Sequence, residues 1–298
     1  MIILSVQDLS KTYGNIKALD HVTFSVPEGV VFGILGPNGS GKTTLLGTVM
    51  DVIRATSGTY KLFEEVPEGR HRQMIGTLLE TPNFYHYLSA QKNLEISAAI
   101  KGRGKDDIDR VLQLVNLTER RHSKFSAFSL GMKQRLAIGA CLLGDPSVLI
   151  FDEPTNGLDP AGIAEIRELI KKLNQQGKTI IMASHLLDEV EKVCTHVAIL
   201  KKGVLLASGN VDDIFATEDI VEVAADNLDV LAETLQQMNG YSTLKIDNKL
   251  IQLFYGQGKT DIAGINRFCF EKGITLTHLQ FKKKSLESKF IELTNTKS

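Results

Sequence analysis

The sequence predicts an α/β fold over residues 1–217 and a small α+β domain over residues 218–298. The α/β assignment depends on continuous apolar segments that alternate with helical segments. The apolar segments are residues 30–36, 147–153, 179–185 and 196–202. Segments that are apolar along their whole length are typical of parallel strands buried on both faces of a sheet. We therefore expect a parallel sheet covered by the helical segments, which are residues 43–53, 161–176 and 186–194.

Two features modify this plan. Residues 2–9 and 20–26 alternate apolar and polar side chains, which is typical of half-exposed antiparallel strands. Residues 84–143 contain amphipathic helical stretches and no buried strand. We therefore expect a mixed sheet that is accompanied by an antiparallel β subdomain and a helical insertion.

Residues 218–298 follow a different pattern. The expected elements are a strand at 220–226, a helix at 228–240, a hairpin at 241–255, a helix at 260–273, a strand at 274–281 and a last helix at 285–294. The order β-α-β-β-α-β, followed by a helix, is that of the ferredoxin-like plan.

The composition argues against several classes of protein. The 298 residues are 43% hydrophobic with a formal net charge of −1, and they lack the basic stripe typical of nucleic-acid binding. No apolar stretch reaches the roughly 18 residues of a transmembrane helix, and the first residues are interpreted as a strand rather than a signal peptide. Cys141, Cys194 and Cys269 lie far apart in apolar surroundings, so we expect buried free thiols in a reducing compartment.

Residues 36–44, GPNGSGKTT, carry the strongest functional signal. They satisfy the pattern G-x-x-x-x-G-K-[ST], in which glycines let backbone N–H groups surround phosphate oxygens. Lys42 is expected to contact the β- and γ-phosphates, and Thr43 to ligate Mg²⁺. An apolar strand precedes the loop and a helix follows it, as this motif requires. The predicted nucleotide contacts are Gly36, Pro37, Asn38, Gly39, Ser40, Gly41, Lys42, Thr43 and Thr44.

A second signal, VLIFDEPTNGLDP at residues 148–160, ends another apolar strand. Because side chains alternate along a strand, two consecutive carboxylates at its end can have different roles. Asp152 is expected to hold Mg²⁺ through water, and Glu153 to polarise the attacking water as a general base. The phosphate loop upstream favours this interpretation over a pair of solvated acids.

A third segment, FSLGMKQRLAIGACLL at residues 128–143, lies between these motifs. It resembles the signature of ATP-binding cassette (ABC) proteins, which is LSGGQ followed by a basic helix-forming stretch. The order of phosphate loop, signature, acidic strand, GLDP and a later Ser-His pair is specific to this family, and the resemblance covers residues 2–216. It implies a P-loop NTPase cassette, in which each ATP lies between the phosphate loop of one cassette and the signature of another.

The resemblance implies roles for five further residues. Ser129 and Gly131 would contact the γ-phosphate held by the partner cassette. Asp159 matches the loop between the two sites, and His185 matches the switch histidine that holds the γ-phosphate and the attacking water. Tyr13 matches the aromatic residue that stacks on adenine. Taken alone, a histidine or tyrosine in these places is more often structural, but the position of His185 after a buried strand favours the catalytic role.

Three positions depart from the family pattern. Leu130 replaces the first glycine of the signature, and Met132 replaces its glutamine. Glu80 lies where the family has a glutamine that contacts Mg²⁺ and water. A glutamate can also ligate Mg²⁺, but it adds negative charge beside the nucleotide. We expect the fold and ATP binding to survive, whereas the effect on turnover stays open.

The same segments resemble the ATPase subunits of bacterial ABC exporters of the bacitracin- and lantibiotic-resistance type. The resemblance implies ATP hydrolysis that drives export through a separate membrane permease. The chain would lie in the cytoplasm, peripheral on the inner face of the membrane. Its other partner would be a second cassette, expected to be an identical copy, and no nucleic-acid partner is expected.

Other interpretations stay open at this point. A soluble ABC ATPase that acts on ribosomes or nucleic acid is disfavoured by the single cassette and the absence of sustained heptads. A regulatory module that binds ATP without hydrolysing it requires Glu80 or Leu130 to be disabling. Phe84, Tyr85 and Tyr87 suit a permease contact or packing within the insertion equally well. The C-terminal domain could regulate, dimerise or touch the permease, and Lys282–Lys284 are interpreted as an ordinary solvated loop.

Overall fold

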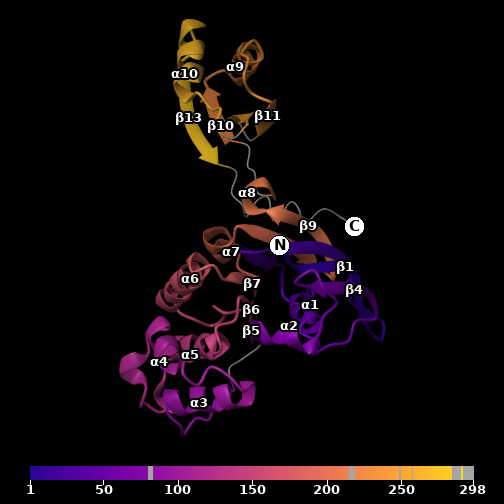
Figure 1. Cartoon of the computed structure of the whole chain (residues 1–298). Coiled ribbons are helices and arrows are strands. Elements are labelled where there is room, and N and C mark those ends of the chain that lie inside the picture. Colours follow the sequence, from indigo (N-terminus) through magenta and orange to yellow (C-terminus); the bar gives the residue numbers. More distant parts are fainter. Residues whose placement is uncertain (80–82, 215–218, 248–249, 257, 284–289, 291–298) are drawn as a thin grey trace. The chain divides into compact units, whose positions relative to one another are not determined.

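The computed structural model describes residues 1–79, 83–214, 219–247, 250–256, 258–283 and 290. The chain forms two compact units, Met1–Ile214 and Phe215–Ser298 (Figure 1). The domain boundary expected at residues 217–218 lies outside the described residues.

A six-stranded mixed sheet forms the centre of the first unit. Its strand order is β5-β6-β7-β3-β8-β9. The strands are β3 (Val31–Leu35), β5 (Ile75–Leu78), β6 (Val148–Asp152), β7 (Thr179–Ser184), β8 (His196–Lys201) and β9 (Val204–Asn210). The first five in this order are parallel, and β9 runs antiparallel to β8. Every residue of β3, β6 and β7 is buried, which confirms the expected parallel strands covered on both faces.

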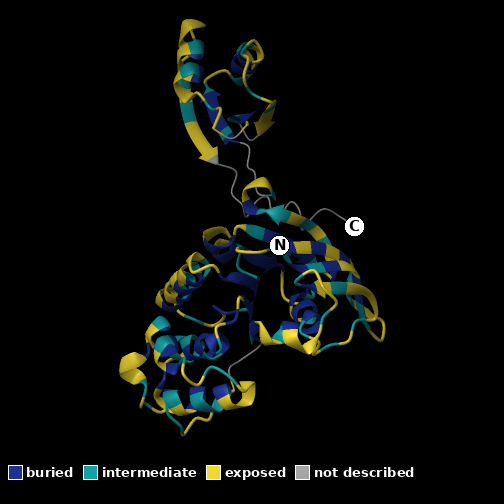
Figure 2. Ribbon diagram, in the orientation of Figure 1, coloured by how far each residue is buried: buried dark blue, intermediate teal, exposed yellow. Residues whose placement is uncertain are grey.

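The expected antiparallel subdomain is a three-stranded sheet with the order β2-β1-β4. Its strands are β1 (Ile2–Tyr13), β2 (Ile16–Pro27) and β4 (Ser57–Leu62). Its inner side chains share a core with α1 (Lys42–Val49) and with one face of the larger sheet (Figure 2). Phe32 and Ile34 belong to this core, whereas Gly33 between them meets α7 (Leu187–Val193) on the opposite face, because neighbouring residues of a strand point to opposite sides.

The helical insertion is confirmed as α3 (Ala90–Lys101), α4 (Ile108–Leu114) and α5 (Leu130–Leu142), with 3-10 turns at Thr118–Arg120 and Phe125–Ala127. The remaining helices of the first unit are α2 (Gly69–Gln73), α6 (Pro160–Gln175) and α8 (Val211–Ile214). Along the parts of the chain that the structure describes, no helix is both long and apolar enough to cross a bilayer.

The second unit has the expected element order. It consists of β10 (Asp219–Ala225), α9 (Leu228–Leu235), β11 (Thr243–Asp247), β12 (Leu250–Tyr255), α10 (Ile262–Glu271) and β13 (Leu276–Lys283). The strands form one antiparallel sheet with the order β11-β12-β10-β13. Helix α9 ends at Leu235, five residues before the expected Gly240. The last helix expected at 285–294 lies outside the described residues, apart from Phe290.

The cysteines are free and buried, as predicted. Burial raises the pKa of the Cys141 thiol to about 12 and raises the pKa of Cys194 and Cys269 as well. Thiols of this kind behave as small apolar side chains.

Candidate active site

The order of the parallel strands brings three distant segments to one edge of the larger sheet. Strand β7 lies between β6 and β3, and all three point the same way. Their carboxyl ends therefore lie side by side. Strand β3 leads into the phosphate loop, β6 ends at Asp152, and β7 ends one residue before His185.

The phosphate loop, residues 36–44, has a backbone that depends on glycine. Gly39 and Gly41 have φ values of 77° and 105°, in the left-handed region. A Cβ atom at Gly41 would lie 2.4 Å from the Ala18 carbonyl oxygen, and one at Gly36 would lie 2.3 Å from that of Leu200. Helix α1 begins at Lys42, so the N–H groups of its first turn can bind phosphate oxygens.

A chain of polar contacts joins the three segments. Lys42 is buried, and its Nζ donates to the Gly36 carbonyl oxygen at 2.8 Å and to that of Pro37 at 3.3 Å. The same Nζ lies 3.3 Å from Glu153 Oε1. The other oxygen of that carboxylate, Oε2, lies 2.8 Å from His185 Nδ1. The structure thus brings together the expected lysine, general base and switch histidine.

Glu153 has an unusual backbone conformation. Its φ is 48°, in the left-handed region that non-glycine residues rarely adopt. Its N–H donates to the Ala183 carbonyl oxygen of β7 at 3.0 Å, which ties the residue to the neighbouring strand. Backbone strain of this kind gathers at functional sites. The turn directs the Glu153 side chain toward His185, while Asp152 stays buried at the end of β6.

The structure describes two of the three residues that are expected to bind Mg²⁺. Thr43 is exposed in the first turn of α1, and Asp152 is the last residue of β6. A hydroxyl and a carboxylate are hard oxygen donors, so their chemistry fits Mg²⁺. Glu80 lies outside the described residues.

The signature and the GLDP loop form a second cluster. Ser129 caps α5 by accepting a hydrogen bond from Met132 N, and Asp159 caps α6 by accepting one from Gly162 N. A cavity of about 450 Å³ is lined by the start of α5, including Gly131, and by the start of α6 with the loop before it, including Gly157. None of the hydrogen bonds found among the described residues joins Ser129 or Gly131 to the phosphate loop of the same chain.

Tyr13 lies at the end of β1, next to the hairpin turn. Its side chain is 47% exposed, and the Lys11 ammonium lies 4.8 Å from the centre of its ring. The ring therefore has surface available for a flat ligand.

The sequence analysis missed one pair of residues near this site. Arg167 of α6 and Glu189 of α7 form a buried ion pair, although both segments were interpreted only as helices. Arg167 lies between Ile163 and Ile170 at helical spacing. A charged residue within such an apolar row is the signal that could have identified it.

Comparison with known proteins agrees with this site. The ABC transporter family model matches residues 19–156. The chain is 37% identical to the uncharacterized ABC transporter ATP-binding protein YhcH of Bacillus subtilis, over 98% of this chain and 96% of that one. It is 36% identical to the bacitracin transport ATP-binding protein BcrA of Bacillus licheniformis, over 98% and 97%. The lantibiotic transport ATP-binding protein SrtF of Streptococcus pyogenes is 35% identical, over 74% of this chain and 99% of its own length.

Solved structures show the same fold. CbiO1 of Clostridium perfringens, part of the ABC transporter complex cbiONQ, superposes with a TM-score of 0.66 and 28% identity, over 80% of this chain and 96% of that one. The cassette MJ0796, dimeric and bound to ADP and phosphate after hydrolysis, superposes with a TM-score of 0.62 and 26% identity, over 70% and 99%. These likenesses and the joined Lys42, Glu153 and His185 side chains lead to one assignment: the chain belongs to the ATP-binding proteins of ABC transporters and is an ATPase of that family.

Proposed function

We propose that this chain is the ATPase of an exporter and that it drives a separate membrane permease by hydrolysing ATP between two identical cassettes. The contacts from Lys42 through Glu153 to His185 support the catalytic part of the proposal, because a lysine, a carboxylate and a histidine lie within direct reach of one another. The groups come from three different strand ends, so their meeting depends on the whole sheet.

The contacts suggest how ATP changes the site. A triphosphate carries more negative charge than one carboxylate, so we expect Lys42 to exchange Glu153 for phosphate oxygens. Glu153 then keeps His185 as its partner, at 2.8 Å in the present structure. Its carboxylate can accept a proton from the attacking water, while the second ring nitrogen of His185 can contact the γ-phosphate.

Mg²⁺ would be held by Thr43 and Asp152, with Glu80 as a third candidate. The ion supplies charge neutralisation at the phosphate oxygens. In this arrangement Asp152 serves the metal and Glu153 the water, so the two consecutive carboxylates have separate roles.

A second copy of the chain would complete each site. Ser129 and Gly131 start a 13-residue helix, α5, whose N-terminus suits the γ-phosphate of a nucleotide held by the other copy. Asp159 lies in the same cluster, and its loop would lie along the contact between the two copies. The dimeric state of MJ0796 supports this arrangement. Tyr13, with its half-exposed ring, would stack on adenine.

Export through a permease is supported by the relatives. BcrA and SrtF are described as bacitracin and lantibiotic transport ATP-binding proteins. Tyr85 and Tyr87 are 51% and 68% exposed next to α3, and aromatic side chains of this kind suit a contact with the cytoplasmic surface of a permease. The chain would therefore lie on the inner face of the membrane through that partner.

The substitution Glu153→Gln tests the catalytic part of this proposal. It should lower kcat for ATP hydrolysis by at least about 100-fold, because the amide cannot take a proton from water. ATP binding should persist, so a dimer should accumulate with ATP and be visible in size-exclusion chromatography. Glu168→Gln is the matched control, since Glu168 is 73% exposed on α6. A Glu153→Gln variant that stays monomeric in saturating ATP would contradict the two-cassette arrangement.

The permease part needs a separate test. The tagged chain should co-purify with a polytopic membrane protein from detergent-solubilised membranes of its host. Recovery of ribosomal proteins or nucleic acid instead would contradict the transport role and leave the ATPase chemistry intact.

A further inference from the structure

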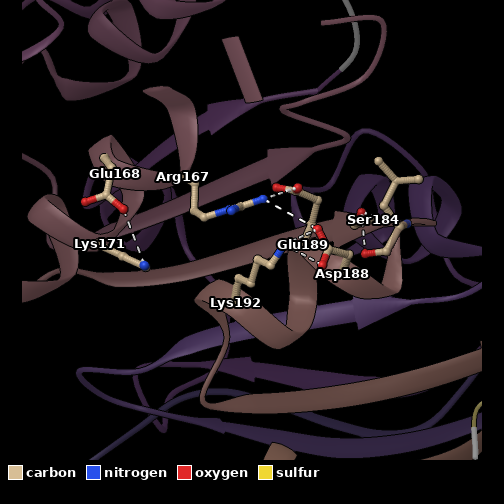
Figure 3. A network of polar contacts seen from close by, with 8 residues as sticks. Arg167, Glu168, Lys171, Ser184, Asp188, Glu189 and Lys192 are labelled. Carbon is tan, nitrogen blue, oxygen red and sulfur yellow. Dashed lines mark hydrogen bonds and ion pairs between the residues drawn. The ribbon is translucent and has the colours of Figure 1, made fainter. Parts of the chain in front are cut away.

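An ion pair that is largely shielded from solvent joins α6 to α7 (Figure 3). Arg167 Nη2 lies 2.8 Å from Glu189 Oε1, and the two side chains are only 18% and 4% exposed. Asp188 also approaches Arg167, at 3.6 Å, but its side chain is 61% exposed. Glu189 is therefore the buried partner, and the carboxylate has little contact with water.

The pair connects the two helices that follow functional residues. Helix α6 begins directly after Asp159, whose carboxylate caps it. Helix α7 begins two residues after His185. Glu189 is four residues after His185 in the sequence, and Arg167 lies about 12 Å along α6 from Asp159, at 1.5 Å per residue.

Packing against the sheet and a hydrogen bond in the preceding loop also hold α7. Val190 and Cys194 rest against Gly33 of β3, where an added Cβ atom would come within 3.0 Å of Val190 Cγ1 and 2.9 Å of Cys194 Sγ. These contacts set the distance of α7 from the sheet. Its N-cap, Leu186, provides no side-chain cap. In the loop before α7, Ser184 Oγ accepts a hydrogen bond from Leu186 N at 3.0 Å. A seven-residue helix has little stability of its own, so its placement depends on such contacts. The pair of Arg167 and Glu189 adds a direct link from its first turn to α6.

The pair also has unused hydrogen-bonding capacity. Arg167 Nε and Glu189 Oε2 are both buried and have no hydrogen-bond partner among the described residues. An arginine and a carboxylate can form two parallel hydrogen bonds, whereas here one short contact joins them. A small relative shift of α6 and α7 can therefore change the number of bonds without breaking the pair.

We propose that Arg167 and Glu189 are positioning residues for hydrolysis, which hold His185 in place against Glu153 and link its position to that of Asp159. The inference rests on the proposed role of His185. When a partner cassette engages the loop at Asp159, α6 moves as a unit, and the ion pair transmits that movement to the first turn of α7. His185 then responds to the partner, although the two residues come from different loops.

Two neighbouring ion pairs provide matched controls, and both are drawn in Figure 3. Lys171 pairs with Glu168 along α6 at 3.3 Å, and Lys192 pairs with Asp188 along α7 at 2.6 Å. Each pair stays within one helix and is largely exposed, so it contributes little to stability. Asp188 also approaches Arg167, so the lysines are the residues to change: Lys171→Met and Lys192→Met should keep the wild-type kcat.

Steady-state ATP hydrolysis by the full chain tests the proposal. Glu189→Gln retains an oxygen that can accept from Arg167, so the variant should fold and bind ATP. We expect kcat to fall about tenfold to a hundredfold, as for other small misplacements of catalytic groups, with KM for ATP unchanged within about twofold. Because Glu189 acts through His185, adding Glu189→Gln to His185→Ala should cause no further loss.

The outcomes separate this inference from the function it rests on. If His185→Ala lowers kcat but Glu189→Gln does not, the positioning role is overturned and the proposed function stands. Losses that multiply in the double variant would also overturn it, since Glu189 would then act independently of His185. If His185→Ala keeps full activity, the proposed role of His185 itself is wrong.

A second variant guards against misfolding. Arg167→Met leaves a buried carboxylate without its partner and can unfold the chain, whereas Arg167→Met with Glu189→Met replaces both charges by apolar groups. The double variant should recover the thermal midpoint of the wild type while kcat stays low. Recovery of both would show that the pair only stabilises the fold, and the proposal would be overturned.

Discussion

The two units of the chain bury charged side chains in different ways. In the first unit, Lys42, Asp152 and Glu189 are buried near strand ends or helix starts. The ion-pair partners of Lys42 and Glu189, which are Glu153 and Arg167, lie in segments that follow strand β6. In the second unit, the buried acids Asp219 and Glu222 both lie on β10, in the interior of the antiparallel sheet.

The two buried acids, Asp219 and Glu222, each have polar partners within the second unit. Asp219 accepts hydrogen bonds from Gly258 N and Thr260 Oγ1, in the loop before α10. Glu222 pairs with Lys282 on the neighbouring strand. A parallel sheet gathers many loops at one edge, where side chains from several segments can act on one ligand. An antiparallel sheet distributes its loops over both ends. We therefore expect the chemistry in the first unit and a structural role for the buried acids of the second.

The largest expected effect compares two buried lysines of the first unit. Lys42→Ala should abolish measurable ATP binding and hydrolysis, because no other side chain replaces its charge at the phosphates. Lys178 is similarly buried, but it pairs with Asp145 at 3.0 Å and with the Pro146 carbonyl oxygen at 2.7 Å. Lys178→Ala should lower the thermal midpoint and leave ATP affinity intact. Equilibrium binding of a fluorescent ATP analogue measures the affinity of the two variants, and thermal unfolding measures their midpoints. Normal affinity in Lys42→Ala would refute the phosphate-loop assignment.

The sequence predicts those parts of the site that are encoded by contiguous segments. The phosphate loop is one run of nine residues, and its Gly39 and Gly41 have the positive φ values that glycine adopts readily. The apolar strands at 30–36, 147–153 and 179–185 identify β3, β6 and β7, because length and hydrophobicity are local properties. Asp152, Glu153 and His185 could then be placed at strand ends without knowledge of the sheet order.

Contacts between distant segments could not be predicted in this way. The Lys42–Glu153 contact depends on β7 lying between β6 and β3, and no local pattern specifies this order. The Arg167–Glu189 pair depends on how two helices lie on the same face of the sheet. The end of α9 at Leu235 was also missed, because the next three residues, Gln236, Gln237 and Met238, are good helix formers. Their turn is selected by packing, with Tyr241 Oη donating to the Leu235 carbonyl oxygen.

A core substitution in the second unit tests whether the two units are energetically separate. Leu231 is fully buried in the core with Val221, Ile251 and Ile265. Leu231→Ala should destabilise this unit by about 2–5 kcal/mol, since it leaves a cavity. ATP hydrolysis by the first unit should change little, because the catalytic residues all lie before Ile214. Hydrogen exchange resolved by peptide measures the loss, with Val230→Ala as the control, since Val230 is 48% exposed.

If Leu231→Ala lost ATP hydrolysis together with the stability of the second unit, the two units would not be energetically separate. Such a result would show that the second unit supports the catalytic state, for example by stabilising the pair of cassettes. The relative SrtF, a lantibiotic transport ATP-binding protein, aligns over 74% of this chain and 99% of its own length.

The smallest expected effect concerns the Glu222 carboxylate, which lies on β10 in the sheet of the second unit. Lys282 donates to Glu222 and lies 2.7 Å from its Oε2, and Gln252 donates to Oε1 at 3.1 Å. The hydrogen bond from Lys282 is the main cause that lowers the pKa of Glu222, and the one from Gln252 adds to it. Lys282 is 49% exposed, so solvent weakens the pair, and Glu222→Gln should cost no more than about 1 kcal/mol near neutral pH.

The pH dependence of that cost has a defined sign. A carboxyl group whose pKa is lower in the folded state stabilises the protein at pH values above its unfolded pKa, and the contribution is lost as the pH falls through the folded pKa. Urea unfolding of the second unit should therefore distinguish wild type from Glu222→Gln at about pH 7, above the ordinary Glu pKa, and the difference should shrink as the pH falls through the lowered pKa of folded Glu222. Glu233→Gln, on the exposed face of α9, should show no difference across this pH range. A Glu222→Gln cost that persists in acid would mean that the carboxylate is held by its shape and hydrogen bonds rather than by its charge, and the contrast with the paired charges of the first unit would then be sharper.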